Sequence, residues 1–256
     1  MAATVSDSSD ASNRYRAAQL GLTRLLVRDV RGLRRLIIPA RLQATVPDWL
    51  TAMQAVIDQY ARVSASLGAD FYDAQREAAG ALGPFTVPVA DPPPEEQSEA
   101  SLRWATKDVW ERDAEDPATT DAQREPVEVR LEQAEKKAEA VAQKLVTDAG
   151  RGTVREAVRQ DRQATAWARS AALGACAFCK LLATRGAVYK QDTADFRAHD
   201  GCHCGVVPVF KGQRFELSDH AREWERLYRE HAEPHSGDQL RRFRKALADN
   251  GHLPAL

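Results

Sequence analysis

The sequence predicts a mainly α-helical protein, with helical arms around a small α+β module that contains a short antiparallel β element. Apolar residues recur at helical spacing over most of the 256 residues. Only two short runs, 187–189 and 205–210, have the composition of strands. All four cysteines lie in one segment, residues 175–206, around those two runs. The apolar fraction of 43% is enough for a core, while the charged fraction of 29% indicates much solvated surface.

The first 82 residues predict an N-terminal helical hairpin after a frayed start of about a dozen residues. The first helix runs from about residue 13 to Pro39, where the missing backbone N–H of proline ends it. A second amphipathic helix covers about 47–80. Residues 83–99 hold five prolines and an acidic end, which predicts a stiff linker.

The remaining chain predicts further helices around the cysteine segment. The expected helices cover about 96–111, 126–149, 154–172 and the residues after Ser218, with a loop at 113–120. The predicted division of the chain is a helical hairpin (1–82), a linker (83–99), a core (100–215) with the Cys/His module in 150–215, and a C-terminal helical arm (216–256).

Charge is segregated along the chain although the formal net charge is only -1. Residues 14–41 contain eight arginines against one aspartate, and residues 151–190 contain eight basic against two acidic side chains. Residues 91–139 contain 15 acidic and 7 basic side chains, a local net charge of -8. The basic segments predict either non-specific contact with DNA phosphates through Arg-rich helices or ordinary solvated helix faces.

The N-terminal residues lack the basic-then-apolar order of a signal peptide. No run approaches the roughly 18 apolar residues that a membrane span needs. We therefore expect a cytosolic chain without a membrane partner. Because cytosolic thiols stay reduced, the cysteines favour a metal site over disulfides.

The cysteines form two close pairs with the spacing of metal ligands. Cys176 and Cys179 fall on one turn, whereas Cys202 and Cys204 lie at the start of a predicted strand, where residues two apart share a face. His199 precedes the second pair by three residues. Closing a loop of this length is ordinary for a structural zinc site. The pattern predicts structural zinc held by four of these five residues and leaves the choice among them open.

His203 lies between two cysteines and on a strand would point away from them, so we expect it at the surface. Four protein ligands leave no open position for a substrate or an activated water, so the site predicts no enzyme activity. A thioredoxin-type site lacks the strands it needs. The H-x-E motif of zinc deaminases, present at His231 and Glu233, follows the cysteines instead of preceding them.

These motifs together resemble the MuF-like family, the minor head proteins of tailed bacteriophages. The resemblance rests on a CxxC motif, a Leu-x-x-Arg-Gly run from Leu182, a tyrosine, and H-x-x-C-x-C from His199. The family pattern is typically H-P-x-C-R-C, so Asp200 and His203 depart from it. Asp161, Trp167-x-Arg169 and the stretch FYDAQREAAG fit the same group, in the version found in phages of actinobacteria.

The resemblance implies a phage minor capsid protein in head morphogenesis, located in the capsid interior near the portal after assembly in the host cytoplasm. Its partners would be the portal protein and/or the major capsid protein, with non-specific DNA contact as a further option. The resemblance also supports His199 as a candidate ligand and His203 as a non-ligand. The alternative is a zinc-scaffolded nucleic-acid-binding or HNH-like nuclease module that would use His199 and Asp200.

Overall fold

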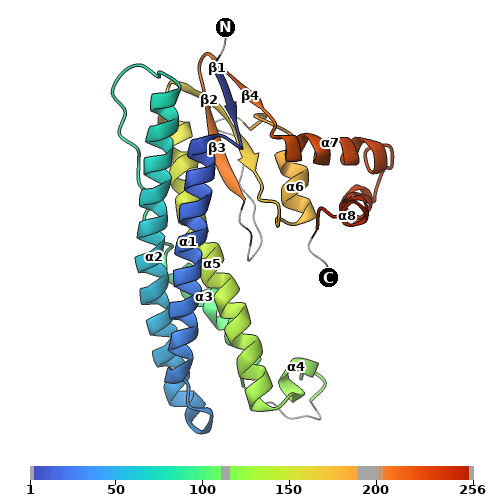
Figure 1. Ribbon diagram of the computed structural model, residues 1–256. Helices are drawn as coiled ribbons and strands as arrows, with labels where there is room; N and C mark the ends of the chain where they lie inside the picture. The colour runs from blue at the N-terminus through green and yellow to red at the C-terminus, as the bar shows by residue number, and fades with distance from the viewer. Residues whose placement is uncertain (1–2, 111–115, 190–201, 203, 254–256) are drawn as a thin grey trace. The chain divides into compact units, whose positions relative to one another are not determined.

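The computed structural model describes residues 3–110, 116–189, 202 and 204–253. The predicted fold class is confirmed, because the chain is mainly helical and has a small antiparallel sheet (Figure 1). The helices are α1 (Asp10–Gly32), α2 (Leu42–Ala78), α3 (Glu95–Thr106), α4 (Asp121–Arg124), α5 (Val127–Gln160), α6 (Ala177–Ala183), α7 (Asp219–His231) and α8 (Gln239–Asp249). The strands are β1 (Ala3–Ser6), β2 (Ala164–Ser170), β3 (Gly205–Phe210) and β4 (Gln213–Glu216).

The chain forms two compact units. Unit 1 comprises Met1–Ala18, Ala65–Ala90 and Gly150–Leu256, and unit 2 comprises Gln19–Ser64 and Asp91–Ala149. Helices α1, α2 and α5 contribute residues to both units. Grouping by contacts does not test independent folding, so the four-segment division along the chain stays a prediction.

The described part of unit 2 is helical, and each long helix buries one apolar stripe. The stripe on α5 has the positions that the sequence predicts for residues 126–149: Leu131, Ala134, Ala138, Val141 and Leu145, each at most 5% exposed. Polar contacts join the helices. Tyr60 of α2 donates to Asp29 Oδ2 of α1 at 2.6 Å, and Arg31 of α1 pairs with Glu139 of α5 at 2.8 Å.

The described residues of unit 1 form two two-stranded sheets. Strands β2 and β3 are antiparallel, with Ser170 opposite Gly205, while β1 and β4 are parallel, with Ala3 opposite Gln213. The predicted strand 205–210 is therefore confirmed as β3. In the predicted strand 187–189, only Tyr189 pairs, through an isolated bridge to Trp167.

The helix expected over 154–172 is wrong beyond Gln160, because residues 164–170 form β2. Helix α5 ends at Gln160, and Asp161 Oδ1 then accepts the backbone N–H of Gln163 at 2.9 Å, an Asx turn that redirects the chain. The last four residues of β2 are all buried. Both faces of the strand are therefore covered there, and the sequence lacks the alternation of apolar and polar residues that marks a strand with one exposed face. Pairing with β3, more than 30 residues later, decides the strand.

The break expected between residues 149 and 154 is also wrong, since α5 is continuous through Gly150 and Gly152. Within unit 1, Gly68 of α2 approaches Gly150 of α5 closely. A Cβ added at Gly68 would lie 2.6 Å from the Gly150 carbonyl oxygen. These glycines thus permit a close backbone contact between two helices and do not end either one.

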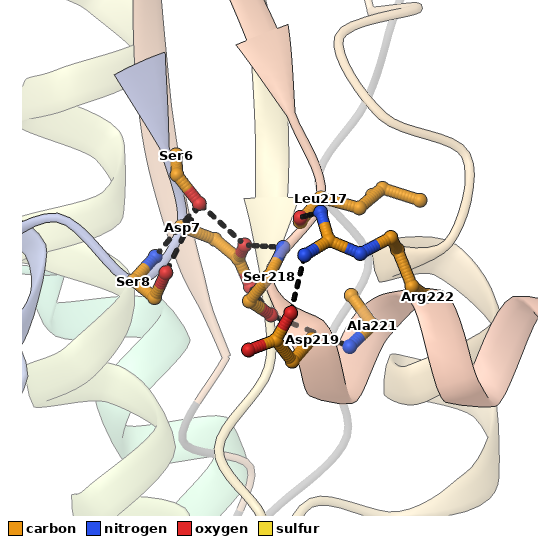
Figure 2. A network of polar contacts seen from close by, with 8 residues as sticks. All are labelled: Ser6, Asp7, Ser8, Leu217, Ser218, Asp219, Ala221 and Arg222. Atoms are coloured by element: carbon orange, nitrogen blue, oxygen red, sulfur yellow. Dashed lines mark hydrogen bonds and ion pairs between the residues drawn. The ribbon is translucent and has the colours of Figure 1, made fainter. Parts of the chain in front are cut away.

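The frayed start expected for the first dozen residues is wrong from residue 3 onward. Residues 3–6 form β1, and the buried Asp7 follows it at the N-terminus of α7 (Figure 2). Asp7 accepts hydrogen bonds from Ser218, the N-cap residue of α7, whose hydroxyl in turn accepts the Ala221 N–H at 3.3 Å. The N-terminal segment is therefore part of the folded unit.

Candidate metal centre

The first cysteine pair is positioned by the start of α6. Cys176 is the N-cap residue, and its Sγ accepts the backbone N–H of Cys179 at 3.4 Å. This cap directs both side chains toward the same end of a short helix, as the CxxC spacing predicts. Cys179 is fully buried, whereas Cys176 is half-buried.

The second pair lies directly before β3, and the fold brings it to Cys179. The Sγ atoms of Cys179 and Cys202 are 2.9 Å apart, those of Cys202 and Cys204 are 3.1 Å apart, and those of Cys179 and Cys204 are 3.6 Å apart. All three side chains are at most 5% exposed. Two segments more than twenty residues apart in the sequence therefore bring three sulfur atoms close together.

This donor set fits a metal ion. The sulfur separations exceed the disulfide bond length of about 2.05 Å, and all four cysteines are free thiols. The three sulfurs lie within 4.8 Å of one another, close enough to share one ion. Thiolate ligands at about 2.3 Å are typical of structural zinc. Three buried cysteines can thus bind a metal ion.

Two buried arginines lie beside the sulfurs. Arg151 of α5 donates its Nε to the Cys204 carbonyl oxygen at 2.7 Å and its Nη2 to the Cys202 carbonyl oxygen. Arg169 of β2 places Nη1 at 3.8 Å from Cys204 Sγ. Neither arginine is more than 4% exposed. The sulfur cluster is therefore surrounded on this side by positive charge.

The pKa values of Cys204 and Cys179 are shifted in opposite directions. Hydrogen bonds from Cys179 and Cys202, with the nearby positive charges of Arg151 and Arg169, lower the pKa of Cys204 well below its usual value. Hydrogen bonds with its cysteine neighbours and burial raise the pKa of Cys179. The lowered pKa favours the thiolate form of Cys204, which is the form that binds metal.

The cluster belongs to a larger apolar core in unit 1. Figure 1 shows α6, α7 and α8 gathered together, and their contacts enclose the cysteines. Cys179, Cys202 and Cys204 share this core with Trp224, Leu227, Phe243 and Leu247. Lys180, fully buried beside Cys179, donates to the His252 carbonyl oxygen and lies 5.0 Å from the Trp224 ring centroid. Metal binding at the cysteines would therefore support the packing of three helices.

Of the five predicted ligands, the structure brings Cys179, Cys202 and Cys204 together and places Cys176 at the cap of the same helix as Cys179. His199 lies outside the described residues, as does His203. Sequence reasoning missed Arg151 and Arg169 as neighbours of the site. The Trp167-x-Arg169 spacing was the one available signal, and it carried no information on which groups the arginine contacts.

The arginines of residues 14–41 are mostly exposed, among them Arg24, Arg35 and Arg41. Arg31 is engaged with Glu139 and Arg28 with Asp29. Among the described residues, no helix combines the length and the apolar character that crossing a membrane requires.

The family model described as VG15 protein matches residues 6–231, most of the chain. No curated protein and no solved structure matches the chain.

Proposed function

Because the chain belongs to the VG15 protein family and is phage-encoded, we propose that it is a minor capsid protein that acts in head morphogenesis. The observation that supports this most directly is the match over residues 6–231, which includes the cysteine cluster, the sheet of β2 and β3, and α7. The resemblance of the cysteine segment to phage minor head proteins supplies the specific role.

The proposed metal is structural, and the protein is not an enzyme. Cys179, Cys202 and Cys204 are buried in the core that α6, α7 and α8 share. Zinc there would connect the start of α6 to the start of β3, two segments more than twenty residues apart in the sequence. Binding free energy of zinc, on the order of 10 kcal/mol in small zinc domains, would add directly to the stability of this region.

The proposed partners are the portal protein and/or the major capsid protein, met in the host cytoplasm during assembly and kept in the capsid interior. Exposed arginines such as Arg24, Arg35 and Arg41 support an additional, sequence-independent contact with packaged DNA. Such a contact would weaken as salt rises, because it releases counterions from the phosphates.

Co-expression with the portal and major capsid proteins encoded by the same phage tests the assembly role. We expect the chain to co-sediment with portal-containing heads at low copy number and to be absent from fractions of free subunits. Heads assembled without portal are the control that separates portal contact from capsid contact. A chain that stays soluble and separate in the presence of both proteins contradicts the proposal.

DNA binding and cleavage are measured on the same purified protein. The proposal expects binding that is independent of sequence and lost at high salt, with no cleavage in the presence of divalent metal. Cleavage that His199→Ala abolishes would instead support a nuclease.

A further inference from the structure

We propose that the metal is bound by all four cysteines as a tetrathiolate, and that Arg151 and Arg169 are the buried residues that neutralise and position this doubly negative centre. The inference rests on the proposed zinc site and adds its ligand set and its surroundings. The inference also gives roles to two arginines that are not metal ligands.

The charge of the centre is the first argument. A divalent ion with four thiolates carries a net charge of -2, whereas three thiolates and a neutral imidazole give -1. Burying uncompensated charge is costly, so a buried centre needs opposite charge nearby. Two buried guanidinium groups at the sulfur cluster supply the opposite charge that a doubly negative centre needs.

Arg169 acts mainly through its charge. It lies on β2 opposite Val206, two residues beyond Cys204, so strand pairing fixes its place beside the cluster. Its Nη1 is 3.8 Å from Cys204 Sγ, a distance at which an N–H donates to sulfur. The side chain is 1% exposed, and the interaction is therefore little screened by solvent.

Arg151 acts mainly through the geometry of its guanidinium group, which makes two hydrogen bonds at once. Its Nε and Nη2 donate to the carbonyl oxygens of Cys204 and Cys202, which are two positions apart in the sequence. This forked contact holds the C-x-C backbone so that both sulfurs face Cys179. A lysine carries its three donors on one nitrogen and lacks the planar fork that holds two separate donors on the two carbonyls.

Cys176 is the fourth ligand that the geometry favours. Its Sγ caps α6 and accepts the Cys179 N–H at 3.4 Å, so both sulfurs of the CxxC pair lie at the same end of the helix. Cys179 belongs to the three-sulfur group with Cys202 and Cys204. A fourth sulfur beside Cys179 completes the ligand number of a structural zinc site.

The ligand set is tested by replacing zinc with cobalt or cadmium in the full-length protein. Thiolate-to-cobalt absorption increases with the number of sulfur ligands, and the cadmium-113 NMR shift separates four sulfurs from three sulfurs and one nitrogen. We expect the four-sulfur spectrum for the wild type and its loss in Cys176→Ser, while His199→Ala keeps it. A three-sulfur, one-nitrogen spectrum in the wild type overturns the assignment.

The arginines are tested by zinc competition against a chromophoric chelator. Because removing partners of metal ligands typically costs about 10–100-fold in affinity, we expect losses in that range for Arg169→Gln and Arg151→Gln. Arg169→Lys should bind nearly as well as the wild type, since it keeps the charge, whereas Arg151→Lys should be as weak as Arg151→Gln. The exposed Arg162→Gln is the matched control.

Circular dichroism shows whether each variant folds. If a glutamine variant does not fold, the zinc affinities of the two lysine variants still test the proposed roles. Equal affinities for wild type, Arg169→Gln and Arg151→Gln overturn the proposed arginine roles. A wild-type protein without bound metal overturns both this inference and the zinc site. The protein could show a four-sulfur spectrum and bind neither the portal protein nor the major capsid protein. That result supports this inference and overturns only the proposed assembly role.

Discussion

Asp7 and Ser218 are 211 positions apart and share two hydrogen bonds. Asp7 Oδ1 accepts the Ser218 backbone N–H at 2.9 Å, and Oδ2 accepts the Ser218 hydroxyl at 3.1 Å (Figure 2). Both residues are buried. The N-terminal segment thus completes the capping of α7, the helix that carries Trp224 into the core around the cysteines.

The first prediction concerns this pair. Asp7→Ala leaves a buried N–H without its acceptor and should lower the free energy of unfolding by about 1–3 kcal/mol. Ser218→Ala removes the N-cap side chain and should cost about 1 kcal/mol. Urea denaturation of both single variants and the double variant measures their coupling. The exposed Ser8→Ala should have little effect, and strictly additive losses would show that the two residues do not act together.

The second prediction concerns the close approach at Gly68. Gly68→Ala places a methyl group 2.6 Å from the Gly150 carbonyl oxygen, so the two helices must separate. Overpacking of this kind costs about 1–3 kcal/mol, measurable by urea denaturation. Gly21→Ala in α1 is the matched control, because an added Cβ there meets nothing within 4 Å. It should stabilise the protein by about 0.5–1 kcal/mol, since alanine favours helices. A stabilised Gly68→Ala would contradict the close contact.

The third prediction is a pH dependence that originates at Tyr72. Its hydroxyl donates to Asp161 Oδ2 at 3.1 Å, and Asp161 also pairs with Arg76 at 2.9 Å. Burial and the Asp161 carboxylate raise the pKa of Tyr72 well above its ordinary value of 10.0. The folded protein therefore holds this proton more tightly than the unfolded chain does. The resulting stability is complete below pH 10 and is lost as the pH rises beyond it.

Tyr72→Phe should lack this contribution. We expect the variant to be less stable than the wild type at pH 8, by about 1 kcal/mol for the lost hydrogen bond. The difference in free energy of unfolding should shrink as the pH is raised above 10. A difference that stays constant over this range would show that Tyr72 does not titrate differently in the two states.

The fourth prediction concerns metal removal. Because three cysteines share a core with Trp224 and Phe243, chelation should loosen α6, α7 and α8 together. Hydrogen–deuterium exchange should accelerate in those helices and remain unchanged in the unit 2 portions of α1 and α2. Cys202→Ser should reproduce the pattern without chelator. Exchange that is unaffected in α6 to α8 would contradict a stabilising metal.

Local patterns in the sequence predicted the elements whose signal lies within a few residues. The apolar seam of 126–149 is buried as expected, since helical spacing alone places those residues on one face. The strand 205–210 was likewise predicted from its composition, and the helix after Ser218 from the spacing of its apolar residues. The two cysteine pairs indicated a shared site, because spacing constrains ligands before the fold is known.

Tertiary structure alone decided the features that depend on distant residues. Residues 164–170 become a strand because β3 pairs with them, and α5 passes Gly150 and Gly152 because α2 packs against it there. The start of the chain is ordered by β4 and Ser218, at the opposite end of the sequence. Arg151 and Arg169 reach the cysteines in the same way. Local spacing cannot encode such contacts, because the free energy that selects them comes from burial and pairing between segments that meet only in the folded chain.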